Sequence, residues 1–275
     1  MFPVVDGVPR LLAKDNELFD RDEVTSTSSS VRSPWLQRIA QLLPQPAYRT
    51  GPDLWTLLRG HVDVAASRLL IVGLGDGGPG VAALRAEFAE VTATDVVPSP
   101  GVDYVCDVHA LPFVDDSFDV VLIAAVLEHV LDPVAAVAEV TRVLRKGGVV
   151  AAETPFMQQV HMGAYDFTRF TELGHRWLFR SYREIARGTA AGPATGLAWS
   201  LIYLLVGATT SPRGAAVAKG IGRIAFSAVA RLDRLVGKKP GASDGASVVF
   251  FVGANEKVPC ITARDLVKSY RGAIR

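Results

Sequence analysis

The chain has 275 residues, of which 49% are hydrophobic, and its 29 basic residues nearly balance its 28 acidic ones. This length and apolar content predict one sizeable core with additions. A net charge of +1 gives no field strong enough to hold a nucleic-acid backbone, so we expect no nucleic-acid partner.

Cys106 and Cys260 lack metal-ligand spacing, so we expect no metal and a reducing compartment. Asp6 and Pro9 stand where a signal peptide needs a basic patch and an apolar run, which predicts a cytoplasmic protein.

Residues 1–67 are expected to form an N-terminal extension. Residues 2–12 alternate apolar side chains around an Asp-Gly pair, which predicts a short hairpin. Residues 25–30 contain only serine and threonine and are typical of a linker. Apolar residues at helical spacing within 34–60 predict helices that either cover the sheet or form part of a lid over the active site.

From residue 68 onward, strand and helix patterns alternate, which predicts an α/β domain over 68–275. Because each predicted helix connects two buried strands, we expect a Rossmann-like, doubly wound sheet that is mostly parallel, with right-handed crossovers. The five predicted strands are 69–72, 91–94, 104–106, 118–125 and 149–152.

One predicted helix follows the fourth strand. Asp132 and Pro133 provide an N-cap and a first-turn proline, and Lys146 with Gly147 predicts its end. The side chains that we expect it to bury are those of Val134, Val137, Thr141 and Leu144.

A glycine-rich segment after the first strand carries the strongest functional signal. Gly73, Gly75 and Gly77 would let the backbone approach a ligand closely. Asp95 comes about 20 residues later, at the end of the second strand, where an acidic residue binds a ribose diol. The ligand is therefore expected to be a nucleoside. Gly73, Gly75 and Gly78 also satisfy the dinucleotide pattern, so NAD remains an alternative.

The stretch 106–155 resembles the core of the class I S-adenosylmethionine-dependent methyltransferases that act on small molecules, and the resemblance covers roughly residues 68–156. Several linked motifs in order are more specific than a lone glycine loop. They are Asp107 before Leu111-Pro112-Phe113, the pair Phe118-Asp119, the triplet Leu127-Glu128-His129, and the Arg-Val-Leu segment from Arg142 to Gly148.

This resemblance implies S-adenosylmethionine as the cofactor, with Asp107 facing the adenine amino group. It also implies a late antiparallel strand near 246–253, which leaves residues 188–240 as an insertion. The family usually has an acidic residue where this chain has Ile71, two positions before the first loop glycine. The residues expected to contact the cofactor are Gly73, Leu74, Gly75, Gly77, Asp95, Val96, Asp107, Val108 and Ala125.

The N-terminal hairpin resembles the closing strand of small zinc ribbons that precede some methyltransferases. The paired cysteines of such a ribbon are absent. We therefore expect no zinc there.

On the acceptor side, His129 and His161 are the candidate catalytic bases, His129 first because it directly follows the fourth strand. Residues 157–171 resemble a segment of methyltransferases associated with glycan and envelope biosynthesis. Tyr165, Asp166 and Arg169 are the polar groups that would contact the acceptor. The alternative is that this segment only packs against the sheet.

Residues 195–236 are predicted either to cover the acceptor pocket or to contact a membrane surface. The apolar run 196–208 is shorter than the ~20 residues that a spanning helix needs. The following stretch, 215–236, has the pattern of one amphipathic helix, which suits an anionic lipid surface. Its basic residues are Lys219, Arg223, Arg231 and Arg234, and its apolar face is Val217, Ile221, Ile224, Leu232 and Leu235.

The sequence thus predicts a methyltransferase for a small-molecule, glycan or lipid-linked acceptor, cytoplasmic or peripheral at the inner face of the membrane. Two alternatives remain open. One is an NAD-dependent oxidoreductase, although the Tyr-x-x-x-Lys pair of short-chain dehydrogenases is absent. The other is a non-catalytic nucleoside-binding or membrane-peripheral protein of the same fold.

Overall fold

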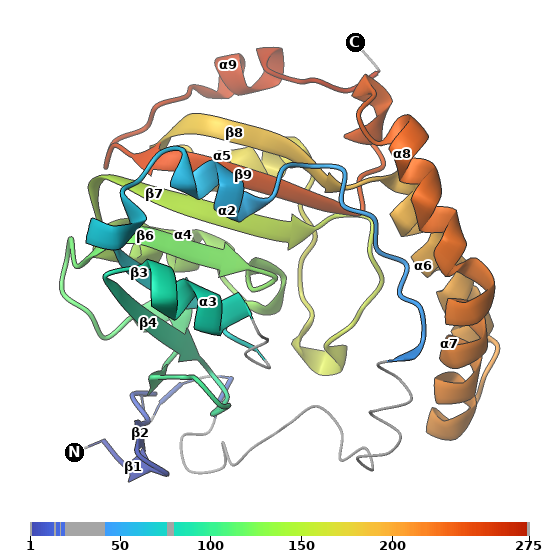
Figure 1. Cartoon of the computed structure of the whole chain (residues 1–275), viewed down its shortest axis with the longest axis horizontal. Coiled ribbons are helices and arrows are strands. Elements are labelled where there is room, and N and C mark those ends of the chain that lie inside the picture. Colours follow the sequence, from blue (N-terminus) through green and yellow to red (C-terminus); the bar gives the residue numbers. More distant parts are fainter. Residues whose placement is uncertain (1, 14, 17, 20–41, 76–79, 274–275) are drawn as a thin grey trace.

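A seven-stranded sheet lies at the centre of the protein (Figure 1), whose computed structural model describes residues 2–13, 15, 16, 18, 19, 42–75 and 80–273. In chain order the strands are β3 (Arg68–Val72), β4 (Glu90–Asp95), β5 (Tyr104–Val105), β6 (Phe118–Ala124), β7 (Leu144–Pro155), β8 (Tyr182–Ala191) and β9 (Val248–Asn255). They are arranged as β5-β4-β3-β6-β7-β9-β8. Strand β9 runs antiparallel to both of its neighbours, β7 and β8, and the other paired strands of this sheet are parallel. The predicted doubly wound, mostly parallel sheet with a late antiparallel strand is confirmed.

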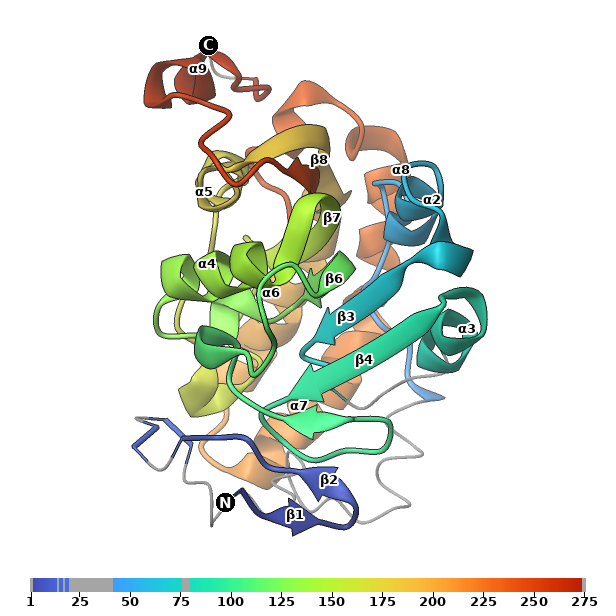
Figure 2. The ribbon, with the colours of Figure 1, turned by 90° about the vertical axis from the view of Figure 1, so that its left-hand side faces the viewer.

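Helices cover both faces of the sheet because its central strands are apolar on both sides. Alternate side chains of β3 point to opposite faces: Leu70 and Val72 belong to one core cluster, Leu69 and Ile71 to the other. Figure 2 shows the helices of the two faces on opposite sides of the sheet. One pair is α4 (Pro133–Val143) and α5 (Glu172–Leu178), and the other is α2 (Leu54–Arg59) and α3 (Gly80–Glu87).

Helix α4 differs from its prediction in its inward face and its end. Asp132 does cap it, accepting hydrogen bonds from the backbone N–H groups of Val134 and Ala135 at 3.0 Å. Of the side chains predicted to face inward, Val137 and Leu144 are buried, whereas Val134 is half exposed; the helix ends at Val143, where β7 begins directly. The helix is apolar around most of its circumference, so its sequence did not determine which stripe packs. The buried stripe is Ala136, Val137, Val140 and Val143.

The N-terminal residues reach the β5 edge of the sheet. Strands β1 (Val4–Val5) and β2 (Val8–Pro9) pair antiparallel around Asp6 and Gly7, both of which have positive φ angles. The backbone N–H of Leu11 then donates to the carbonyl of Val105 at 2.7 Å. The linker 25–30 and most of the first helix predicted within 34–60 lie outside the described residues. The second part of that prediction corresponds to α2.

Helical segments connect β8 to β9 and lie beyond the carboxyl end of β7 (Figure 1); the last of them is the short 3₁₀ turn η6 (Pro240–Ala242), and the other four pack together. These four are α6 (Pro193–Gly207), α7 (Pro212–Phe226), the 3₁₀ turn η5 (Ser227–Leu232) and α8 (Asp233–Val236). The single helix predicted over 215–236 is therefore broken. The buried carboxylate of Asp233 accepts hydrogen bonds from the N–H groups of Ala194 and Thr195, at 2.8 and 2.9 Å, and so caps α6. This contact draws α8 back against the start of α6.

The charged and apolar residues of these helices also depart from the predicted faces. Arg223 is buried, and its guanidinium donates to the carbonyls of Leu43 and Pro44, so it does not belong to an exposed basic face. Each of the predicted apolar side chains is more than half exposed: Val217, Ile221, Ile224, Leu232 and Leu235. In the described part of the chain, no helix is both long and apolar enough to cross a membrane.

Candidate active site

Two glycines shape the loop that leaves β3. Gly73 and Gly75 have φ angles of 73° and 62°, a left-handed conformation that side chains rarely adopt. A Cβ atom on Gly73 would lie 2.2 Å from the Val126 side chain, whereas one on Gly75 would meet no atom within 4 Å. Gly73 therefore permits close packing on the segment after β6, and Gly75 borders open space. Gly77 lies outside the described residues.

Asp95 joins this loop to the end of β4. Its carboxylate accepts hydrogen bonds from the backbone N–H of Gly75 at 2.7 Å and of Val97 at 3.0 Å. A carboxylate has about four lone-pair sites, so it can accept two more bonds from a ligand. Leu74 and Val96, the neighbours of Gly75 and Asp95, are half-buried. The glycine loop and the acidic residue are thus brought together, as a ribose site requires.

Asp107 lies after β5, at the start of the turn η2 (Val108–Ala110). Its carboxylate accepts hydrogen bonds from the backbone N–H of His109 at 2.9 Å and from the side-chain amide of Asn16 at 2.7 Å. Val108 is buried in the core below it. The edge at which the resemblance places adenine is therefore bordered by the N-terminal segment.

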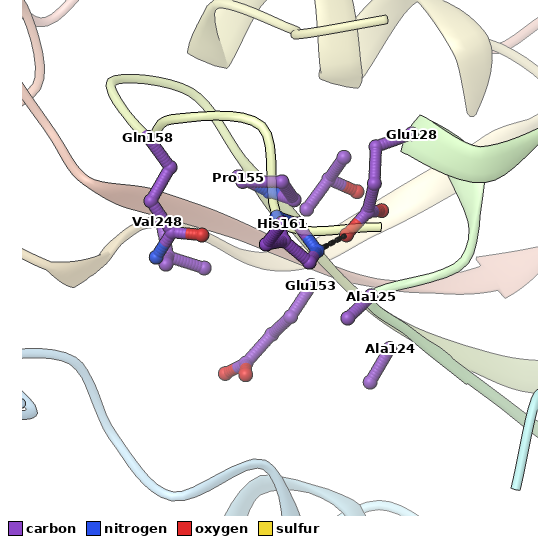
Figure 3. A pocket seen from close by; sticks show the side chains of 9 residues that line it. Ala124, Ala125, Glu128, Glu153, Pro155, Gln158, His161 and Val248 are labelled. Carbon is purple, nitrogen blue, oxygen red and sulfur yellow. Dashed lines mark ion pairs between the residues drawn. The ribbon is translucent and has the colours of Figure 1, made fainter. Parts of the chain in front are cut away.

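A pocket lies at the carboxyl ends of β6 and β7 (Figure 3). Ala125, directly after β6, has a φ angle of 54°, which is unusual for a residue with a side chain. Its backbone N–H donates to the carbonyl of Glu153 at 2.9 Å, which holds it beside β7. The residues that line the pocket are Ala124, Ala125, Glu128, Glu153, Thr154, Pro155, Gln158, His161 and Val248.

Two histidines and a glutamate meet beside this pocket. Glu128 and His129 belong to the turn η3 (Leu127–His129), and His161 belongs to the loop after β7. The Nε2 atoms of His129 and His161 are 3.1 Å apart, and each lies 3.6 Å from Oε1 of Glu128. Figure 3 shows the Glu128 and His161 side chains pointing toward one another. The two candidate bases therefore form one group, with a carboxylate behind them.

Each of these side chains has a distinct environment. The Glu128 side chain has no exposed surface, and neither carboxylate oxygen has a hydrogen-bond partner within the described structure. The neighbouring Glu128 carboxylate raises the pKa of His161, although burial opposes the shift. Nδ1 of His129 lies 2.6 Å from the Tyr165 carbonyl. Since a carbonyl only accepts, this nitrogen carries the hydrogen, and the lone pair of the neutral ring lies on Nε2.

Two of the predicted acceptor residues, Asp166 and Arg169, form hydrogen bonds with the backbone of the loop that carries His161. Asp166 accepts a hydrogen bond from the His161 backbone N–H at 2.9 Å and forms an ion pair with Arg169. Burial acts to raise the pKa of Asp166, but the Arg169 and His161 hydrogen bonds together lower it well below its usual value. Arg169 also donates to the carbonyls of Gln158 and Gln159. Tyr165 is partly exposed and stacks on Phe19 at a ring-centroid distance of 5.7 Å.

The structure thus gathers Gly73, Gly75 and Asp95 in one place and the two histidines in another. Sequence reasoning missed Glu128, although it is part of the Leu-Glu-His motif; an acidic residue beside a candidate histidine was the available signal. It also missed Asn16 and Phe19, for which the sequence carries no signal. Their partners lie about 90 and 150 residues away along the chain.

Comparisons with known proteins place the first part of this site in a family. Residues 70–152 match the family model described as "Methyltransferase domain". An "Uncharacterized methyltransferase" of Mycobacterium avium (strain 104) is 38% identical over 112 residues, which is 35% of this chain and 42% of that protein. A "Demethylmenaquinone methyltransferase" of Mycobacterium marinum is 32% identical over 126 residues, 45% of this chain and 48% of that protein.

Each alignment spans less than half of the relative's own length. Among solved structures, the [4+2]-cyclase SpnF superposes with a TM-score of 0.48 and 17% identity, over 81% of this chain and 91% of that one. The segment matched by the family model, residues 70–152, contains the glycine loop, Asp95 and the Leu-Glu-His turn. It includes the strands β4, β5 and β6 of the sheet described above. The chain therefore contains, at residues 70–152, a class I S-adenosylmethionine-dependent methyltransferase domain.

Proposed function

We propose that the whole chain transfers a methyl group from S-adenosylmethionine to a small-molecule acceptor, held in the pocket between β6 and β7. The observation that carries this proposal is the adjacency of two sites at one edge of the sheet. The Gly73–Gly75 loop and Asp95 form the nucleoside side, and Val126, which packs on Gly73, immediately precedes the turn that carries Glu128 and His129. Ligands of open α/β sheets bind at this carboxyl edge.

Methyl transfer from S-adenosylmethionine requires alignment of the acceptor more than activation of the donor. The sulfonium centre is already a strong methyl donor, so the protein must orient the acceptor and exclude water. A lone pair of the acceptor forms a bond to the methyl carbon while the carbon–sulfur bond breaks, and its electron pair stays on sulfur in S-adenosylhomocysteine. For a hydroxyl acceptor, the released proton can pass to Nε2 of His129, whose lone pair the Tyr165 carbonyl contact fixes.

Calorimetry with purified protein tests the cofactor. S-adenosylhomocysteine should bind with one-to-one stoichiometry, and NAD should give no heat of binding. Turnover is then sought by incubating the protein and labelled S-adenosylmethionine with a set of hydroxylated and quinol acceptors. NAD binding without a response to S-adenosylhomocysteine would make an oxidoreductase the better proposal. Cofactor binding with no methyl transfer to any acceptor would favour the non-catalytic alternative.

We also propose that the helical part of the predicted insertion 188–240, which begins after β8 ends at Ala191, interrupts a domain spanning 68–275. We further propose that the acceptor is lipid-linked and reaches the protein at a membrane surface. The support is the row of exposed apolar side chains on α7, η5 and α8, including Val217, Ile221 and Ile224. Exposed apolar groups of this number commonly mark an interaction surface. Arg231 and Arg234 are exposed beside them and suit anionic lipid.

Vesicle cosedimentation tests the membrane contact. The protein should sediment with anionic vesicles and less so as salt rises, because attraction to anionic lipid is screened. Replacing Arg231 and Arg234 with Gln should reduce binding to anionic vesicles. Arg223 is left unchanged because it holds the Leu43 and Pro44 carbonyls. Equal sedimentation of both proteins at every salt concentration, or none for either, would leave the insertion as a pocket cover.

A further inference from the structure

The carboxylate of Glu128 is in an unusual state for a buried charge. Its side chain has no exposed surface, and both oxygens lack a hydrogen-bond partner within the described structure. Burying an ionised carboxylate without a partner costs several kcal/mol, so such groups are normally paired or bound to a metal ion. The imidazoles of His129 and His161 each lie 3.6 Å from one oxygen of this carboxylate. The carboxylate is therefore placed to complete a site with these rings.

Both rings present the same nitrogen to the carboxylate, because the other nitrogen of each faces an acceptor. Nδ1 of His129 donates to the Tyr165 carbonyl at 2.6 Å, and Nδ1 of His161 lies 3.4 Å from both the Gln159 carbonyl and the Asp166 carboxylate. Metal-binding histidines usually donate their other ring N–H to a carbonyl or a carboxylate in this way, which fixes the tautomer and the ring orientation. The Nε2 lone pairs of both neutral rings are thus directed away from these partners.

The distances among the three ligand atoms match those around a metal ion. The Nε2 atoms are 3.1 Å apart, and each is 3.6 Å from Oε1 of Glu128. A point equidistant from the three atoms lies roughly 2 Å from each of them, the usual length of Zn–N and Zn–O bonds. Because Glu128 and His161 line the pocket and His129 stands beside it, a bound ion would be next to the acceptor space.

We propose that Glu128, His129 and His161 bind one divalent transition-metal ion, with at least one coordination position left for an oxygen of the acceptor. Two imidazoles and one carboxylate suit Zn²⁺, Co²⁺, Ni²⁺ or Fe²⁺, whereas Mg²⁺ and Ca²⁺ prefer oxygen ligands throughout. Three protein ligands with an open position are the pattern of catalytic sites rather than structural ones. The metal and a proton would occupy the same lone pairs, so the metal-loaded and proton-accepting forms of this group exclude each other.

Binding of the metal does not depend on the proposed function; only its role toward the acceptor rests on that function. In that role the ion would hold the acceptor oxygen and polarise its O–H bond, and the proton would leave to water. An acceptor with two adjacent oxygens, such as a vicinal diol or a catechol, would fill two positions of the ion. The expectation of no metal rested on the cysteines alone and did not consider these histidines. A metal titration distinguishes that expectation from the proposed site.

The test uses the full chain without an affinity tag, freed of metal by a chelator that is then removed. Titration with Zn²⁺ should show one equivalent bound, and Co²⁺ should develop visible absorption bands of a nitrogen- and oxygen-ligated site. Zn²⁺ should also raise the thermal unfolding midpoint. Glu128→Gln and His161→Ala should each weaken Zn²⁺ binding by at least ~100-fold, since loss of an outer-shell partner alone costs ~10–100-fold. His61→Ala, which removes an exposed histidine elsewhere, should bind as the native chain does.

Glu128→Gln keeps the size of the side chain and removes its buried charge, so the variant should fold; circular dichroism and calorimetric S-adenosylhomocysteine binding verify this on the same samples. No bound Zn²⁺ in the native chain would overturn the proposal. Equal binding by native, Glu128→Gln and His61→Ala proteins would mean an adventitious metal only and would also overturn it. Retained S-adenosylhomocysteine binding in either case would leave the methyltransferase proposal standing. Metal binding without S-adenosylhomocysteine binding would leave the metal site standing and overturn the methyltransferase proposal.

Discussion

Replacing Asp95 with Ala should weaken S-adenosylhomocysteine binding by roughly 1.5–3 kcal/mol, or about 10- to 150-fold. The carboxylate already accepts hydrogen bonds from the backbone N–H groups of Gly75 and Val97, at 2.7 and 3.0 Å. Its remaining lone pairs would accept the two hydroxyls of a ribose. The variant loses this charge-assisted pair and also the bond that orders the glycine loop before the ligand arrives.

Calorimetry with native, Asp95→Ala and Asp95→Asn proteins measures the effect. Asp95→Asn retains one carbonyl oxygen and should lose less affinity than Asp95→Ala. Asp63→Ala is the matched control, because Asp63 is exposed and its side chain makes no capping hydrogen bond. Unchanged affinity in Asp95→Ala would refute the placement of the ribose, provided that the native protein binds the ligand.

His129→Ala should lower methyl transfer by at least ~10²-fold with little change in S-adenosylhomocysteine affinity; unaltered turnover in a folded variant would show that the acceptor needs neither a base nor a metal ligand from this side chain. Gly73→Ala should destabilise the fold by about 2 kcal/mol or more, because left-handed strain adds to a clash with Val126. In Gly75→Ala the new Cβ meets no atom, so the cost should be only about 1–2 kcal/mol. Equal urea unfolding midpoints for the two variants would contradict this difference. His175 is buried, and burial lowers its pKa to about 3 from 6.5. The unfolded state then binds the extra proton, so stability should be full above pH 6.5 and fall by up to ~1.4 kcal/mol per pH unit below it; urea unfolding of His175→Gln should lack this slope, and an identical slope would refute the assignment.

Much of the fold could be predicted because its signals are local. The apolar runs of β3 and β6 are buried on both faces and therefore need no alternation, and the turn that follows β3 requires glycine at 73 and 75 for conformational reasons. Asp95 could be placed at the same edge of the sheet because the carboxyl ends of parallel strands meet there. None of these inferences requires knowledge of a contact between distant residues.

The group formed by Glu128, His129 and His161 could be predicted only in part. His161 lies in an irregular loop, so no periodicity indicates that its ring comes within 3.1 Å of the His129 ring. The burial of Glu128 is also invisible in the sequence, where an acidic residue after a strand most often faces solvent. Along 215–236, helical periodicity is continuous, but the tertiary contact of Asp233 with the start of α6 accompanies a break that periodicity cannot show.

The Asp233 cap has a consequence for how this chain can be recombined with its relatives. One carboxylate near the end of the helical segment satisfies backbone groups at its beginning, including Ala194 N–H and Thr195 N–H. Gly192 leaves the space for it, since a Cβ there would lie 2.4 Å from the Asp233 carboxylate. A chimera that exchanges α6 without α8 would therefore separate a helix start from its cap and leave a buried charge unpaired. Residues 192–237 should therefore be exchanged as a single unit in any chimera.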